Sequence, residues 1–214
     1  MVSRLVPTLL CTVLLWTGAT AACAQFAPQF GVTLGLNRAT IESADADPGS
    51  RWLFAGGAVA RQPLVGPLAA QAELLLNQKG ASISGEEGTI RYGASYVDLP
   101  LQLRAEAPSL GAVTLSGTAG GYGAVKVFER QRAGEDLSFP LRTSTSFFRR
   151  IDAGWMAGVG ATIDLNTRRL NLTVRYAHGL TDVGRSIEEH PFPDAPFPRA
   201  AQTRTWSLLL RFGL

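Results

Sequence analysis

Eight short stretches of this chain alternate apolar and polar residues, and this period of two constrains the fold more than any other feature. It is clearest in residues 95–106, where Val97, Leu99, Leu101 and Leu103 alternate with residues that are polar or charged except for Pro100. Because successive side chains of a strand point to opposite faces, each stretch is predicted to be a β-strand with one apolar and one polar face. A soluble sandwich would bury the apolar faces, whereas a transmembrane barrel would turn them outward to lipid.

The connections between the predicted strands alternate in length. The strands are predicted at 30–40, 51–61, 68–79, 95–106, 112–127, 151–164, 170–179 and 203–214. Three connections are short and rich in turn residues, namely 62–67, 107–111 and 165–169. The long connections are 41–50, 80–94, 128–150 and 180–202. Short turns at one end and long loops at the other are typical of outer-membrane barrels, in which the turns are periplasmic and the loops extracellular.

Residues 1–24 are predicted to form a cleaved signal peptide. Arg4 supplies the positive charge, and residues 5–16 supply an apolar run that is too short to span a bilayer. Residues 22–24 supply a small-residue cleavage site. The alternatives are an uncleaved membrane anchor and a lipid-modified Cys23.

The predicted mature domain, residues 25–214, contains no cysteine, because Cys11 and Cys23 both precede it. Disulfides and cysteine metal ligands are therefore not expected. No apolar stretch after residue 25 has the ~20 residues that a transmembrane helix needs, so only strands could cross a membrane. The sequence pI of about 9.2 could suggest a nucleic-acid partner. We expect none, because the arginines are scattered and exported proteins rarely meet nucleic acid.

Four segments, in order, match a known pattern. They read GVTLGLN at 31–37, AELLLNQKG at 72–80, YVDLPL at 96–101 and RYAHGLTD at 175–182. Together they resemble the outer-membrane β-barrel domain family, often labelled porin family proteins. The chain departs from the family pattern at Asn77, where Ser is frequent, and at Leu214, where an aromatic residue is frequent.

The resemblance implies an all-β fold, an eight-stranded antiparallel up-and-down transmembrane β-barrel in a Gram-negative outer membrane. It implies no defined activity and no cofactor. The implied partners are outer-membrane lipid, lipopolysaccharide and the barrel assembly machinery, and the oligomeric state stays open.

The polar faces of the predicted strands carry charged residues that such a barrel would enclose. An eight-stranded barrel is just wide enough for side chains to fill it. The expected lumen-facing residues are Glu73, Lys79, Tyr96, Asp98, Gln102, Arg104, Glu106, Lys126, Asp152, Arg175 and Arg211. We expect a structural charge network that plugs the lumen, formed by Glu73, Asp98, Arg104, Glu106, Asp152, Arg175 and Arg211, with Arg104 beside Glu73, Asp98 and Glu106. A gated ion path is the alternative interpretation.

The last long connection contains two Pro-Phe-Pro repeats, which make Phe192 and Phe197 candidates for contact with a partner or with lipopolysaccharide. A stiffened surface loop is the other interpretation. Ser186, Glu188 and His190 lie in the same connection, but neighbours on one loop do not form a preorganised triad. We therefore expect no enzyme activity and predict no catalytic, cofactor or metal site.

The sequence is compatible with three functions. The first is a structural or interaction barrel with a plugged lumen, the second a small porin-like channel, and the third a soluble periplasmic barrel that binds an apolar ligand. The apolar faces include large aromatic residues, as an aromatic girdle at a membrane interface would. These residues are Trp52, Trp155, Tyr176, Trp206 and Phe212.

Overall fold

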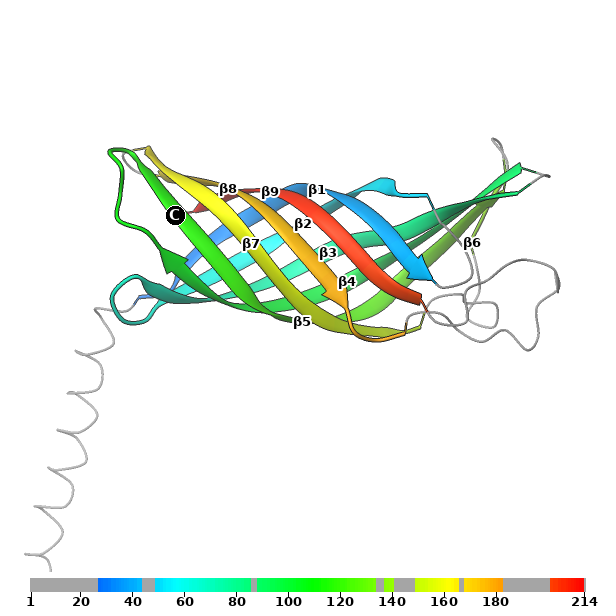
Figure 1. The fold of residues 1–214 in the computed structure, drawn as a ribbon, viewed down its shortest axis with the longest axis horizontal. Coiled ribbons are helices and arrows are strands. Elements are labelled where there is room, and N and C mark those ends of the chain that lie inside the picture. Colours follow the sequence, from blue (N-terminus) through cyan, green and yellow to red (C-terminus); the bar gives the residue numbers. More distant parts are fainter. Residues whose placement is uncertain are drawn as a thin grey trace, which may run out of the picture.

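The computed structural model describes residues 27–43, 49–85, 88–133, 137–140, 149–165, 168–182 and 201–213, and most of them lie in β-strands (Figure 1). The strands are β1 (Gln29–Ser43), β2 (Arg51–Pro63), β3 (Leu68–Gly85), β4 (Gly88–Glu106), β5 (Val113–Ala133), β6 (Leu137–Pro140), β7 (Ile151–Leu165), β8 (Arg168–Gly179) and β9 (Ala201–Gly213). Among the described residues, no helix is long and apolar enough to serve as a membrane span.

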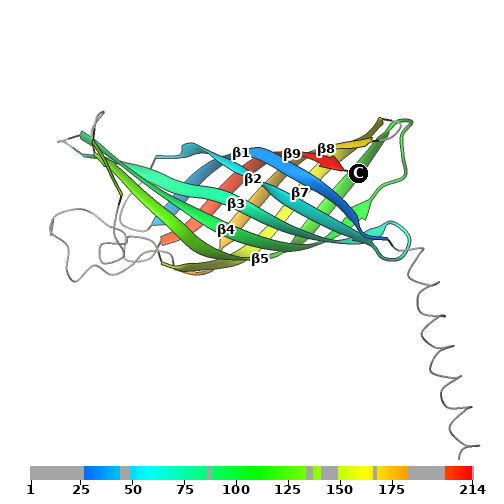
Figure 2. The same ribbon diagram turned by 180° about the vertical axis from the view of Figure 1, so that it is seen from behind.

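The strands form one closed antiparallel barrel. They pair in the order β4-β3-β2-β1-β9-β8-β7-β5, and the additional β4–β5 pairing closes the ring. Among the described strands, the short β6 pairs with the far end of β5 alone, so eight strands make the wall. Figures 1 and 2 show this wall from opposite sides, with all strands tilted against the long axis. The predicted eight-stranded antiparallel barrel is confirmed.

Two of the predicted loops are partly strand. β3 and β4 continue to Gly85 and Gly88, which are register partners, so the prediction of a loop over 80–94 is wrong. β5 likewise runs to Ala133, beyond its predicted end at 127. The sequence of these ends has no sustained alternation of apolar and polar residues, so the pattern that predicts strands stops short of them. Their pairing is made by backbone hydrogen bonds, which need no such alternation. β3, β4 and β5 accordingly project beyond the rest of the wall in Figure 1.

Apolar side chains cover the outside of the barrel and polar side chains fill the inside. Leu101 is 58% exposed, whereas its neighbour Gln102 is 5% exposed and lies within the lumen. Trp52, Trp155 and Trp206 are exposed on the outer wall. Trp155 and Trp206 contact Tyr176 there, with ring centroids 5.6 and 4.9 Å away. This orientation is the one a barrel in lipid requires.

A few apolar side chains lie inside. Leu75, which interrupts the alternation of the third stretch, is buried in the lumen together with Met156 and Leu209. They line a cavity of about 20 Å³ with Asn77 and Asp98, among others, which is room for about one water molecule. The middle of the lumen is therefore packed rather than open.

Glycine is required at two turns and at crowded positions of the wall, of which Gly154 is an example. Gly66 and Gly111, in the β2–β3 and β4–β5 turns, have φ angles of 57° and 65°, a region that favours glycine. A Cβ at Gly154 would lie 2.7 Å from the Tyr122 ring and 2.1 Å from the His178 carbonyl oxygen. Gly154 thereby makes room for Tyr122 in the lumen.

Candidate functional site: the charged lumen

The first charged cluster of the lumen is centred on Glu73 of β3. This carboxylate is buried and accepts hydrogen bonds from Arg175 Nη2 at 2.6 and 2.7 Å, one to each oxygen. Arg211 Nη2 donates to the same carboxylate at 2.9 Å. Because β8 and β9 are separated from β3 by β1 and β2, these bonds cross the lumen and join opposite walls.

Two amides complete the Glu73 cluster. Gln71 Nε2 donates to Glu73 Oε1 at 2.6 Å, and Gln102 Nε2 donates to the same oxygen at 3.2 Å. The carboxylate is thus enclosed by four donors, as a buried charge must be to remain ionised.

The second cluster is centred on Lys79, nearer the loop end of β3. Its amino group donates to Asp152 at 2.8 Å and lies 3.5 Å from Asp98. The ammonium also faces the rings of Tyr96 and Tyr122, at 5.1 and 4.5 Å from their centroids. Carboxylates and aromatic faces together compensate this buried cation.

Polar neighbours hold the two carboxylates of the second cluster. Asp152 accepts from Thr181 at 2.7 Å and from Thr203 at 3.2 Å. Asp98 accepts from Asn77 at 2.6 Å. The cluster therefore connects β3, β4, β7 and β9 near the loop end of the barrel.

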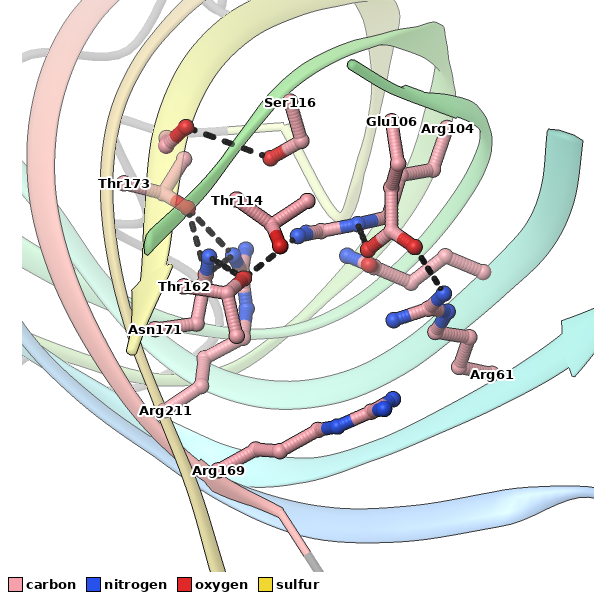
Figure 3. Close-up of polar contacts among 12 residues, drawn as sticks. Arg61, Arg104, Glu106, Thr114, Ser116, Thr162, Arg169, Asn171, Thr173 and Arg211 are labelled. Atoms are coloured by element: carbon pink, nitrogen blue, oxygen red, sulfur yellow. Dashed lines mark hydrogen bonds and ion pairs between the residues drawn. The ribbon is translucent and has the colours of Figure 1, made fainter. Parts of the chain in front are cut away.

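The third cluster lies at the turn end and is drawn in Figure 3. Glu106 accepts from Arg61 Nη2 at 2.5 Å and from Arg104 Nε at 3.1 Å. Arg104 Nη2 also donates to Thr162 Oγ1 at 3.0 Å. At the rim, Arg169 Nε donates to Asp164 at 2.8 Å.

The seven residues proposed as one network all lie on the inner wall, but in three clusters. Glu73, Arg175 and Arg211 form the first, Asp98 and Asp152 join the second, and Arg104 and Glu106 join the third. Arg104 was expected beside Glu73, Asp98 and Glu106, but of these three it pairs with Glu106 alone. Glu73 pairs with Arg175 instead, and Asp98 pairs with Lys79.

Sequence reasoning missed Arg61 as a member of these clusters and did not predict the central position of Lys79. Arg61 was outside the expected lumen residues, because Gly56 and Gly57 blur the alternation of its strand. Lys79 was expected inside but not as the centre of a cluster. Its position on the polar face of β3 was the available signal.

The remaining candidates lie outside the described residues. They are the signal peptide 1–24 with Cys11 and Cys23, and the loop residues Ser186, Glu188, His190, Phe192 and Phe197. The other histidine, His178, lies beside Trp155 and Tyr176, with centroids 5.9 and 6.5 Å away.

Several buried polar atoms of the described residues have no hydrogen-bond partner within the protein. Asn37 Oδ1, Asp98 Oδ1 and Arg175 Nε belong to residues that line the small central cavity. Arg61 Nε and Arg211 Nε belong to residues at the turn end. Unpartnered buried groups are uncommon and indicate places where water or a ligand is held.

Comparison with known proteins gives a family and a set of similar folds. The family described as outer membrane protein beta-barrel domain matches residues 24–185. The Neisserial surface protein A structure is 12% identical and covers 86% of this chain and 96% of its own, with a TM-score of 0.49.

Two further structures are similar. Ail of Yersinia pestis, solved in complex with the heparin analogue sucrose octasulfate, is 10% identical, with 87% of this chain and 99% of that chain covered and a TM-score of 0.43. The N-terminal barrel domain of Pseudomonas aeruginosa OprF is 7% identical, with 87% and 100% covered and a TM-score of 0.36. No curated protein sequence matches the chain.

Proposed function

The chain belongs to the outer membrane protein beta-barrel domain family, and on this premise we propose that its lumen is plugged and that it acts through its extracellular loops. In this proposal the barrel is a structural or interaction protein of the outer membrane and not a channel. The ion pairs that cross the lumen are the observation that carries the proposal.

The Glu73 cluster is the main support for a closed lumen. Three charged side chains, Glu73, Arg175 and Arg211, are buried and span the lumen between β3 and the opposite strands. An ion passing this level would have to separate a desolvated pair, and removing one partner of such a pair costs about 3–5 kcal/mol.

The Lys79 cluster would form a second barrier in series. It lies farther along β3 toward the loop end, and Leu75 lies between Glu73 and Asn77 on the same inner face. Two charged layers separated by packed side chains favour a plug over a conducting path, since a path would need both layers to open together.

The orientation of the faces does not fit a soluble barrel that binds an apolar ligand. Its lumen would have to be apolar and its exterior polar, whereas Leu101 faces outward and Gln102 inward. If the conductance test described next shows an open lumen, it favours the second function, a small channel.

Planar-bilayer recording tests the plug. We expect the wild-type protein to show no steady openings and Glu73→Gln to conduct, because the change leaves Arg175 and Arg211 without their carboxylate. Asp164→Asn, which affects only the exposed pair with Arg169, is the matched control and should stay closed. Steady, large openings of the wild type would overturn the plug and favour the channel.

The loop role rests on the sequence of residues 183–200, which lie outside the described part of the chain. Phe192 and Phe197 are proposed to contact lipopolysaccharide or a partner. Binding of the refolded protein to vesicles with and without lipopolysaccharide tests this contact. A double substitution of both phenylalanines by Ser is expected to remove the difference between the two vesicles, and an unchanged difference would argue against it.

A further inference from the structure

A pocket at the turn end of the lumen is lined by arginines. Its volume is about 60 Å³, and of the described residues that line it four are arginines and none is acidic. These four are Arg61, Arg104, Arg169 and Arg211. In Figure 3 they surround the turn end of the lumen, and they come from four different strands, β2, β4, β8 and β9.

The ion pairs around this pocket do not balance. Five guanidinium groups, those of the four lining arginines and Arg175, pair with three carboxylates, those of Glu73, Glu106 and Asp164. Among the described residues, the excess is two positive charges. Because charges are poorly solvated inside a barrel, such an excess favours the entry of an anion.

Two of the arginines also have an unused donor. The Arg211 side chain is 5% exposed, and its Nη atoms are engaged by Glu73, Asn171 and Thr173. Its Nε is buried and has no partner, and neither has Arg61 Nε. A guanidinium can only donate, so an acceptor is needed at this place. A negatively charged acceptor would satisfy the donors and the charge together.

The pocket is reached from the turn end. A wider vestibule of about 500 Å³ shares Thr162 and Arg169 with it and is lined by the β4–β5 turn and Asp164. On the inner side, the Glu73 cluster separates the pocket from the middle of the lumen. A ligand would therefore enter from the turn side and stop at this cluster.

We propose that this pocket binds a small tetrahedral oxyanion of the phosphate type. Guanidinium groups match the geometry of such an anion, with paired N–H donors directed at two oxygens. Arg61 and Arg169 bind it at the open side, and Arg211 binds it from the lumen. The pocket takes one phosphate group, either free inorganic phosphate or the phosphate of a lipid headgroup.

Calorimetric titration with inorganic phosphate tests the site. The full chain is refolded in a nonionic detergent without phosphate, and one saturable site is expected. Arg61→Gln and Arg169→Gln should each weaken binding at least about tenfold, because each removes a charge-assisted hydrogen bond. Arg38→Gln is the matched control: Arg38 is exposed on β1 and donates to Ser50, away from the pocket, so affinity should be unchanged.

Two further measurements make the result decisive. Heat-dependent gel mobility verifies folding of each variant, and Arg169→Lys, which keeps the charge, is expected to recover part of the affinity. Absence of saturable binding to the folded wild type would overturn the proposal. An unchanged affinity of folded Arg169→Gln, or an equal loss in Arg38→Gln, would also overturn it, because binding would then not depend on this pocket.

Micelles containing phosphatidic acid distinguish the two sources of phosphate. Displacement of inorganic phosphate by this lipid assigns the site to a headgroup. Undiminished binding of inorganic phosphate assigns it to the free anion, and both results support the pocket. Phosphate binding from the turn side does not require the lumen to conduct ions.

Discussion

Arg175 donates to both carboxylate oxygens of Glu73 across the lumen, at 2.6 and 2.7 Å, although the two residues are 102 positions apart in the chain. The pair joins β8 to β3, on opposite sides of the ring. Because both side chains are buried, removing either one is expected to leave an uncompensated charge.

Arg175→Met is expected to destabilise the barrel by about 3–5 kcal/mol, because Glu73 then loses both of its bonds from Arg175 Nη2 while it remains buried. Urea unfolding of the refolded protein measures the change. Arg169→Met is the control. Its pair with Asp164 is nearly half exposed, so about 0–1 kcal/mol is expected. Similar losses in the two variants would contradict the assigned burial.

Arg104→Ala is expected to cost less than Arg175→Met. Glu106 keeps its bond to Arg61 after the change, so the carboxylate is not left alone. The loss is limited to the hydrogen bonds with Glu106 and Thr162, worth about 1–3 kcal/mol. Urea unfolding of the two variants measures which substitution lowers the free energy of unfolding more. A larger decrease for Arg104→Ala than for Arg175→Met would place the main plug at the turn end.

Leu101→Arg is expected to destabilise the barrel by about 2–4 kcal/mol, because position 101 is on the outer wall and the introduced guanidinium would put a charge into lipid. Leu101→Met keeps the face apolar and serves as the control, with little change expected. Stability is measured by refolding in vesicles rather than in detergent, since the penalty depends on the lipid. A tolerated Leu101→Arg would mean that this face does not meet the bilayer.

The folded protein is expected to fractionate with the outer membrane and to require detergent for extraction. The outward Leu and Val side chains and the exposed Trp52, Trp155 and Trp206 would otherwise face water. An unboiled sample should migrate differently from a boiled one on a gel. Recovery of a monodisperse protein without detergent would contradict the membrane location.

Sequence by itself determined the eight wall strands, although not their full lengths, and the apolar and polar faces of most of them. Alternation is a local property, so Leu101 and Gln102 could be assigned to opposite faces without knowing any partner strand. Turn residues between strands were equally local signals, as Gly66 and Gly111 illustrate.

Tertiary structure alone decided which charges pair. The stagger of eight strands sets the level of each side chain along the axis, and this stagger depends on all the pairings together. Arg211 reaches Glu73 from 138 positions away, whereas Arg104 turns to Glu106 on its own strand. No local pattern distinguishes these choices.

The same reason explains the arginine pocket. Its four arginines lie on β2, β4, β8 and β9, and only the closed ring places them at one end. The alternation indicates that a side chain faces inward, but it carries no information about the neighbour across the lumen. The sequence therefore determined a barrel with a polar interior, and the closed structure decided what that interior can bind.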